Sequence, residues 1–260
     1  MKIAIIGAGA MGSAMARGFV AGGAVVPADV TVANPHAAKL EPLKALGVNV
    51  TTSNTEAVAG ADFVILAVKP WVVVDVLDEL KPVLQLERQA IVNVAASVTG
   101  QDITDALSAG NVTPAVFQVI PNTAIAYCAS MTFIAPCSCT QPQQEQLKAL
   151  FDSCGSTLLL EEHELAAATA LSSCGIAYAM RYVRAASEGG VELGFKADVA
   201  KDIVLQTLQG AVSLLKASGN HPEAEIDKVT TPGGLTIKGL NAMEAHGFTT
   251  AVIEGLKASL

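Results

Sequence analysis

The feature that most constrains the fold is a glycine-rich turn that directly follows a short apolar run at residues 2–6. The turn consists of Gly7, Ala8, Gly9, Ala10, Met11 and Gly12. Between a strand and a helix, the first glycine allows a tight turn, the second lets the backbone approach a pyrophosphate, and the third lets the helix lie against the sheet. Amide groups at the start of the helix then face the anion. The turn predicts a dinucleotide site, with an ordinary glycine-rich turn as the alternative.

The first 160 residues alternate short apolar runs with segments of helical composition. Strands are expected at residues 2–6, 30–33, 48–51, 63–68, 90–94, 116–120, 131–135 and 157–160. Helices are expected at residues 14–21, 37–46, 72–80, 101–109 and 142–154. A continuous apolar run such as 63–68 is typical of a parallel strand buried on both faces. The alternation predicts an α/β fold, with a Rossmann-type doubly wound parallel sheet in a dinucleotide-binding domain over residues 1–160.

The pattern changes after residue 160, because no convincing strand follows. Long Ala- and Leu-rich stretches cover residues 164–187, 196–217 and 240–258, with breaks at Gly189, Gly190, Gly194 and residues 218–222. They predict an all-α second domain of three or four helices over residues 161–260. Residues 166–171 and 203–215 are apolar on more than one face, and such helices need partners on several sides. We therefore expect a homodimer or higher homo-oligomer formed through these C-terminal helices.

Composition and charge exclude several other classes of protein. The net charge of −8 leaves no basic surplus to neutralise phosphates, so no nucleic-acid partner is expected. The most apolar stretch, residues 63–77, contains Lys69, Pro70 and Asp75 and falls short of the roughly 20 residues that a spanning helix needs. No membrane partner is expected, and the apolar run at residues 2–6 leaves no room for a signal peptide before it.

The five cysteines and four histidines show no metal-ligand spacing. Cys137 and Cys139 lie close together, but no second Cys or His pair stands at the spacing of a zinc site. An odd number of cysteines within apolar segments favours free thiols in a reducing compartment. We therefore expect a cytoplasmic protein without a metal ion.

The end of the second expected strand bears on the choice of dinucleotide. An NAD-specific site usually has Asp or Glu there to bind the ribose 2′-hydroxyl. This strand instead ends Val-Ala-Asn-Pro-His, without a carboxylate. Asn34 tolerates a 2′-phosphate, and His36 or Lys39 would help to neutralise it. The segment favours NADPH, with NADH as the alternative, and a plain strand-to-helix turn is an equally good interpretation of Asn34.

Several further segments have a specific composition and order. In the first half these are Ser-Asn-Thr-Glu at 53–56, Ala-Val-Lys-Pro at 67–70, Val-Ala-Ala-Ser-Val-Thr at 94–99 and Ile-Pro-Asn-Thr at 120–123. In the second half they are Thr-Ala-Leu-Ser-Ser-Cys-Gly-Ile-Ala-Tyr at 169–178 and Val-Thr-Thr-Pro-Gly-Gly-Leu-Thr at 229–236. Together with the glycine-rich turn, they resemble the pyrroline-5-carboxylate reductase family over nearly the whole chain. The two C-terminal blocks are the most specific part of that resemblance.

The resemblance implies reduction of Δ1-pyrroline-5-carboxylate to L-proline, the last step of proline biosynthesis, by hydride transfer from NAD(P)H. The cofactor residues that it implies, added to those of the glycine-rich turn and Asn34, are Asn54, Ala67, Val68, Lys69, Pro70, Ala95, Ala96 and Asn122. The substrate residues that it implies are Ser172, Ser173, Thr231, Gly233, Gly234, Leu235 and Thr236. A solvated side chain is the favoured interpretation of Lys69, with a catalytic lysine as the alternative. Close helix packing is an equal alternative for the two serines.

The chemistry of the second C-terminal block suits a cyclic imino acid. Glycines expose backbone amides, and a turn that leads into a helix presents several of them to a carboxylate. By resemblance, Thr236 hydrogen-bonds the ring nitrogen. A threonine is a poor general acid, so we expect it to orient a protonated iminium or relay a solvent proton. The alternative is a plain helix-initiating turn with Thr236 as N-cap.

The chain departs from the family pattern at a few positions. Ser173 and Cys174 stand in place of Gly-Ser, and Ile176 and Ala124 each stand in place of a proline. Gln118 stands where an arginine is common, and the sequence ends at Leu260, before the arginine-containing tail of many members. These departures concern the substrate pocket and leave the fold prediction intact.

Three other functions compete with the favoured one. A β-hydroxyacid dehydrogenase needs a catalytic lysine on the first interdomain helix, and no lysine lies between Lys148 and Lys196. A broader NADPH-dependent imine reductase is compatible with the departures at Cys174 and Ile176. A non-catalytic NADP-binding regulator of the same fold would have no need of the block at 229–236.

Overall fold

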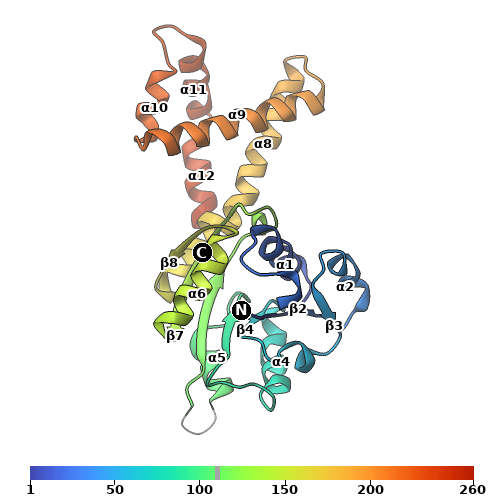
Figure 1. Cartoon of the computed structure of the whole chain (residues 1–260). Coiled ribbons are helices and arrows are strands. Elements are labelled where there is room, and N and C mark those ends of the chain that lie inside the picture. Colours follow the sequence, from blue (N-terminus) through green and yellow to red (C-terminus); the bar gives the residue numbers. More distant parts are fainter. Residues whose placement is uncertain (109–111) are drawn as a thin grey trace. The chain divides into compact units, whose positions relative to one another are not determined.

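The computed structural model describes residues 1–108 and 112–260. The chain divides into two compact units, Met1–Ser173 and Cys174–Leu260, each with its own architecture (Figure 1). The boundary predicted after residue 160 falls at the end of the last strand, and the short helix that follows still belongs to the first unit.

The first unit contains one eight-stranded sheet in the order β3-β2-β1-β4-β5-β6-β7-β8. Its strands are β1 (Ile3–Ile6), β2 (Val30–Ala33), β3 (Asn49–Thr51), β4 (Phe63–Leu66), β5 (Ala90–Asn93), β6 (Ala115–Ile120), β7 (Ser130–Ser138) and β8 (Gly155–Leu159). The eight strands expected from the sequence are all present, and the predicted Rossmann-type sheet is confirmed.

The sheet is not parallel throughout, because β7 runs antiparallel to β6. The expectation of a wholly parallel sheet was therefore wrong at this edge. The connection between Ile120 and Ser130 holds only the short 3₁₀ segment η3 (Thr123–Tyr127). A parallel crossover needs a dozen or more residues, usually with a helix. Because this connection is shorter, the chain returns in the opposite direction. Strand β8 then pairs parallel to β7.

Helices cover both faces of this sheet and form two separate cores. On one face lie α1 (Ala10–Gly22), α2 (Ala37–Lys44) and α6 (Gln141–Asp152), which share a hydrophobic core with Ile3 and Ile5 of β1. On the other face lie α3 (Asn54–Ala57), α4 (Val73–Leu80) and α5 (Gly100–Leu107), which share a second core with Ala4 and Ile6. Alternate residues of each strand point to opposite faces, which is why every residue of β1 is apolar.

The predicted helices have the expected positions, with small differences at their ends. The glycine-rich turn starts α1 at Ala10, earlier than the expected start at residue 14. The helix expected at 101–109 ends at Leu107, and residue 109 of that prediction lies outside the described residues. Helix α3 and the 3₁₀ segments η1 (Pro27–Asp29), η2 (Pro70–Val72) and η4 (Glu162–Glu164) had no sequence prediction, because segments of three or four residues are too short to show a period.

The first unit ends in an irregular helix. It starts as α7 (Leu165–Ala168), continues as one π-helical segment (Thr169–Cys174) and passes into the second unit. The hydroxyl group of Thr169 donates a hydrogen bond to the carbonyl of Leu165 at 2.7 Å. A π-helical turn within an α-helix is uncommon and is found mostly at functional sites.

The second unit is entirely helical, as predicted. It contains α8 (Gly175–Glu192), α9 (Ala197–Ser218), α10 (Pro222–Lys228), α11 (Leu235–Ala245) and α12 (Phe248–Lys257). The expected number of three or four helices was therefore too low. The stretch 240–258 is divided at Gly247, which has a φ of 78°. Conversely, α8 continues through Gly189 and Gly190, where a Cβ atom on Gly190 would lie 2.8 Å from the Cβ of Ala200 in α9.

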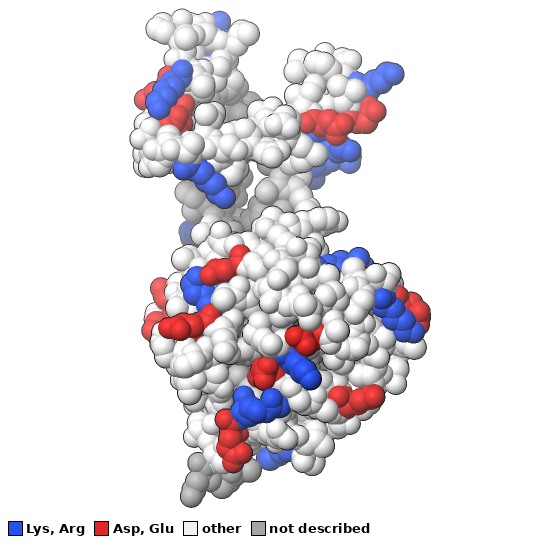
Figure 2. All heavy atoms as spheres, viewed as in Figure 1, with Lys and Arg blue, Asp and Glu red and all other residues white. Residues whose placement is uncertain are grey.

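The helices of the second unit bury very little within their own chain. Ala200, at 2% exposure, is its single buried residue. Figure 2 shows that much of the surface of α9 carries no charged side chain, and residues 203–215 contain none. Among the residues described, no helix is both long enough and apolar enough to span a membrane.

Candidate functional site

The predicted cofactor residues gather at the carboxyl edge of the sheet in the first unit. Strands β1, β2, β4, β5 and β6 run in the same direction, the last residues of the first four are paired in register, and β6 extends two residues beyond the partner of Asn93. The residues that follow these ends include Gly7, Asn34, Ala67, Ala95 and Asn122. The strand order reverses between β1 and β4, and at such a switch point open α/β sheets bind ligands.

The glycine-rich turn has the geometry that its sequence predicts. Gly7 has a φ of 111°, and its amide donates to the carbonyl of Ala33 at 2.8 Å. A Cβ atom on Gly7 would collide with the carbonyl of Ala67, and one on Gly12 would collide with the carbonyl of Gly7. Both positions therefore require glycine because of close backbone approach.

Gly9 differs from its two neighbouring glycines because it lies in open space. A Cβ atom on Gly9 would have no heavy atom within 4 Å. Gly9 is also the N-cap of α1 and has no side chain to accept from the first amides of the helix, at Ala10 and Met11. An uncapped helix start beside empty space suits a pyrophosphate group, so the residues here fit a bound dinucleotide.

The loop after β4 lies beside this turn. The amide of Ala67 donates to the carbonyl of Ile6 at 2.8 Å, and Val68 lies against Gly7. Lys69 is exposed, and its side chain makes no hydrogen bond or ion pair to the part of the chain that the structure describes, in keeping with the solvated interpretation. Pro70 begins η2, and Trp71, the only tryptophan, is 77% exposed there.

Asn34 and Asn54 both have local hydrogen bonds. Asn34 is buried, and its backbone amide donates to the carbonyl of Thr51 at 3.2 Å. Its side-chain Oδ1 accepts from the backbone amide of His36 at 3.0 Å. Asn54 begins α3, and its Nδ2 donates to Oε2 of Glu79 at 2.8 Å. Asn34 therefore stands where a ribose is expected, while Asn54 must share its amide group with Glu79 in any contact with a ligand.

One predicted cofactor residue contacts one predicted substrate residue directly. The Nδ2 of Asn122, a residue with 5% exposure, donates to Oγ of Ser172 at 3.0 Å. Its Oδ1 accepts from the amide of Ala124 at 3.0 Å. The hydroxyl of Ser173 donates to the carbonyl of Pro121 at 3.4 Å. Asn122 and both serines therefore join the π-helical segment to the end of β6.

The remaining predicted substrate residues form a compact turn in the second unit. The amide of Gly234 donates to the carbonyl of Thr231 at 2.9 Å, and Gly233 has a φ of 70°. Pro232 and Gly233 occupy the central positions, as is usual for a type II turn. Gly234 is the N-cap of α11 and has no side-chain cap, so amides at the start of the helix remain available to an anion.

Thr236 is not the N-cap of α11, and that alternative was wrong. It is the second residue of the helix, after Leu235, and its side chain is exposed. Its hydroxyl makes no hydrogen bond to the residues that the structure describes. The hydroxyl is therefore free to contact a ligand bound at the same helix start.

Burial raises the pKa of several cysteine thiols. All five are free thiols. Burial of its sulfur, with the nearby charge of Glu162, raises the pKa of Cys137 to about 12. Burial raises the pKa of Cys139 as well. Within residues 1–108 and 112–260 there is no group of three or more His, Cys, Asp or Glu side chains that could hold a metal ion.

Sequence reasoning missed two residues at the carboxyl edge. Asn93, the last residue of β5, is fully buried, and Ser97 has a φ of 64° that is unusual for a residue with a side chain. The available signal was a polar residue at the end of an apolar strand.

A Rossmann-type sheet, an open helix start at its carboxyl edge and a helical second unit define a dinucleotide-dependent oxidoreductase of two-domain plan. Comparison with known proteins identifies the family. The family model for "NADP oxidoreductase coenzyme F420-dependent" matches residues 2–97, and that for "Pyrroline-5-carboxylate reductase dimerisation" matches residues 162–260.

Similar proteins of known name cover the whole chain. The pyrroline-5-carboxylate reductase of Synechocystis sp. is 33% identical over 261 residues, which cover 100% of this chain and 96% of that protein. Pyrroline-5-carboxylate reductase 1 of Dictyostelium discoideum is 39% identical, and this chain spans 48% of its length. A pyrroline-5-carboxylate reductase structure from Coxiella burnetii is 27% identical, covers 99% of this chain and 95% of its own, and has a TM-score of 0.88. The chain belongs to the pyrroline-5-carboxylate reductase family, and the predicted resemblance is confirmed.

Proposed function

We propose that this chain reduces Δ1-pyrroline-5-carboxylate to L-proline with a hydride from NADPH. The observation that carries the proposal is the relationship to reductases of this name over the full length of the chain, at 33% identity to a protein of which it covers 96%. The open helix starts at Gly9 and Gly234 support it, because the reaction needs one site for a pyrophosphate and one for a carboxylate.

Binding and orienting the cofactor is the main task of the first unit. When bound, the dinucleotide supplies the hydride, so the protein has to hold the two partners at the right distance. We assign the pyrophosphate to the amides at the start of α1 and the adenosine ribose to Asn34. NADPH is preferred to NADH because no carboxylate side chain stands at the end of β2. The nicotinamide end is assigned to the loops after β4, β5 and β6.

The second unit and the end of the first unit are assigned to the substrate. The amides of Gly233, Gly234 and Leu235 hold the carboxylate at the start of α11. The hydroxyl of Thr236 hydrogen-bonds the ring nitrogen, which takes a proton as the carbon of the C=N bond takes the hydride. Because a threonine hydroxyl is a weak acid, it orients a nitrogen that is already protonated or relays a proton from solvent.

We also propose that the enzyme is a homodimer or higher homo-oligomer through its C-terminal helices. The family model that matches residues 162–260 is a dimerisation model. Apolar side chains on α9 that remain about half exposed, such as Ile203, Leu205 and Leu214, support it, because such surface is typical of an interaction site. The cytoplasmic location expected from the sequence stays a prediction.

The test of the reaction is oxidation of NADPH with and without Δ1-pyrroline-5-carboxylate, repeated with NADH. We expect rapid oxidation that depends on the substrate and is faster with NADPH. The variant Thr236→Ala should lose most turnover with unchanged affinity for NADPH. The matched control is Thr230→Ala, which removes a hydroxyl bonded to the carbonyl of Asp227 just before the turn.

Two other outcomes would replace this proposal. Turnover of other cyclic imines without turnover of Δ1-pyrroline-5-carboxylate would identify a broader imine reductase. Binding of NADPH without turnover of any imine would identify a non-catalytic NADP-binding protein. Wild-type turnover in Thr236→Ala would remove that residue from the mechanism while leaving the reaction in place.

A further inference from the structure

Two buried amide side chains lie opposite each other, one at the end of β5 and one two residues before the end of β6. Asn93 and Gln118 are paired in register and are 0% and 4% exposed. The Nδ2 of Asn93 donates to Oε1 of Gln118 at 2.9 Å. We call this pair the amide clamp. Buried amide groups persist only where hydrogen bonds satisfy them, so their partners show what the pair is for.

The partners of the amide clamp lie on the loop after β5, residues 94–99. The Nε2 of Gln118 donates to the carbonyl of Val98 at 2.7 Å, and Nδ2 of Asn93 approaches the same carbonyl at 3.0 Å. Asn93 also donates to the carbonyl of Ala95 at 3.1 Å and accepts from its amide at 3.1 Å. The clamp therefore fixes the inner side of the loop at both of its ends.

The part of the loop between these fixed ends holds a strained residue. Ser97 is exposed and has a φ of 64°, the left-handed conformation that glycine usually adopts in such turns. A residue with a side chain stays in this conformation only when its surroundings determine it. Ala96 and Ser97 are exposed, and their backbone amides make no hydrogen bond to the described residues, so these amides are free to contact a ligand.

The amide clamp also explains why glutamine suits position 118. An amide side chain both donates and accepts, and Gln118 accepts from Asn93 while it donates to Val98. An arginine at this position has no acceptor and could not complete the pair. The pairing with Asn93 therefore depends on the glutamine of this chain.

We propose that Asn93 and Gln118 are positioning residues that hold Ser97 in its left-handed conformation and so set the surface that Ala96 and Ser97 present to the nicotinamide end of the cofactor. This rests on the proposed function, which assigns that loop to the cofactor. The clamp acts through the backbone and does not touch the ligand. Its loss lets Ser97 relax, because an L-residue favours negative φ.

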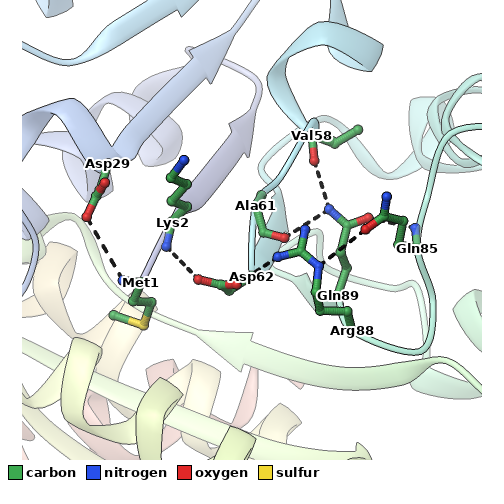
Figure 3. Close-up of polar contacts among 9 residues, drawn as sticks. All are labelled: Met1, Lys2, Asp29, Val58, Ala61, Asp62, Gln85, Arg88 and Gln89. Carbon is green, nitrogen blue, oxygen red and sulfur yellow. Dashed lines mark hydrogen bonds and ion pairs between the residues drawn. The ribbon is translucent and has the colours of Figure 1, made fainter.

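The test compares Gln118→Met with Gln89→Met, which makes the same change in a matched position. Gln89 is 1% exposed, and its Nε2 donates to the carbonyls of Val58 and Ala61 at 2.8 and 3.0 Å (Figure 3). It precedes β5, whereas Gln118 lies at the carboxyl edge. The two substitutions therefore remove similar buried hydrogen bonds from opposite edges of one sheet.

Two quantities are measured for each variant, the melting temperature and the dissociation constant for NADPH. The dissociation constant is measured by quenching of the fluorescence of Trp71. Trp71 is the only tryptophan and is exposed after β4, at the same edge of the sheet. We expect both variants to lose similar thermal stability. The dissociation constant should rise about fivefold in Gln118→Met, as the loss of roughly one hydrogen bond implies, and stay near the wild-type value in Gln89→Met.

Substitutions of Ser97 test whether the amide clamp acts through this residue. Glycine adopts a positive φ without strain, so Ser97→Gly added to Gln118→Met should recover at least half of the lost affinity. Ser97→Val keeps the amide but opposes the left-handed conformation, and should by itself weaken NADPH binding. Because residue 97 is exposed, this variant tests the proposal even where Gln118→Met does not fold.

Equal losses of affinity in Gln118→Met and Gln89→Met would overturn the proposal, as would wild-type affinity in Ser97→Val or no recovery with Ser97→Gly. These results differ from a failure of the proposed function. In that case the wild-type protein itself would not reduce the imine, whether or not NADPH quenches the fluorescence of Trp71.

Discussion

The two units of this chain differ in how far they bury their apolar side chains. In the first unit, helices cover both faces of the sheet, and large side chains such as Phe19, Phe117 and Phe151 are fully buried. In the second unit, five helices bury only Ala200, while Ile203 and Leu214 remain about half exposed, at 47% and 60%. The second unit therefore has too little core to be stable by its own packing.

This difference in burial indicates which contacts stabilise each unit. The free energy of unfolding of the first unit comes from contacts within one chain. In the proposed homo-oligomer, part of that of the second unit comes from apolar surface buried against other subunits, and so depends on protein concentration. Four predictions test this contrast, beginning with the one of largest effect.

The variant Phe19→Ala should destabilise the first unit by about 3–5 kcal/mol, the usual cost of removing a buried aromatic ring. Phe19 is fully buried and packs edge-on against Phe151, with ring centroids 5.4 Å apart. Urea unfolding should show the same loss at every protein concentration. The control, Leu214→Ala, changes an exposed side chain of α9, and its effect should vary with concentration. A loss that varies with protein concentration for Phe19→Ala, and not for Leu214→Ala, would contradict the difference between the two units.

The variant Ile203→Glu should convert the oligomer to smaller species, because it places a charge within an apolar surface. Burying an unpaired carboxylate costs at least about 2–3 kcal/mol per subunit, enough to dissociate a micromolar dimer. Light scattering at several concentrations measures the change. The control is Val74→Glu on α4, at 56% exposure in the first unit. An unchanged mass for Ile203→Glu would remove this face of α9 from the interface.

Two glycines sharpen the comparison within the first unit. Gly7→Ala should destabilise the fold by about 1–3 kcal/mol, because its φ of 111° and the carbonyl of Ala67 leave no place for a methyl group. Gly9→Ala should leave the melting temperature unchanged, because its Cβ meets nothing within 4 Å. It should instead weaken NADPH binding about tenfold, by entering the space assigned to the pyrophosphate. An equal loss of stability in Gly7→Ala and Gly9→Ala would contradict the different roles assigned to these two glycines.

The smallest effect concerns one carboxylate in each unit. Hydrogen bonds from the backbone and hydroxyl of Thr99 lower the pKa of Asp102. Hydrogen bonds from Lys228 and Asn220 lower the pKa of Glu225 to about 2. Because both values fall on folding, each group stabilises the protein at neutral pH, and the contribution is lost as the pH falls through the lowered pKa.

Salt distinguishes the two carboxylates. Glu225 has a charged partner, so high salt should raise its pKa back towards the ordinary value. Asp102 has uncharged partners, so its pKa should change less. Titration followed by NMR at low and high salt measures both. A pKa of Asp102 that responds to salt as much as that of Glu225 would show that nearby charges, and not the bonds to Thr99, determine it.

Much of the fold could be predicted because it depends on local patterns. The apolar runs at β1 and β4 indicate buried strands, and the glycines at 7, 9 and 12 indicate a strand–turn–helix unit. The family resemblance likewise rests on segments that are contiguous in sequence. These features need no knowledge of which distant residues meet, which is why the positions of the eight strands, the helical second half and the family were predicted.

Other features depend on contacts between residues far apart in the chain, and only the tertiary structure decided them. The bond between Asn122 and Ser172 joins residues 50 positions apart, and the amide clamp joins Asn93 to Gln118 across 25. A single polar residue in an apolar strand does not indicate its partner. The reversal at β7 was missed for the same reason, because the direction of a strand depends on its neighbours. The sequence by itself determined the elements and the class of site, whereas packing determined which side chains meet there, because hydrogen bonds between distant residues form only after the strands that carry them are paired.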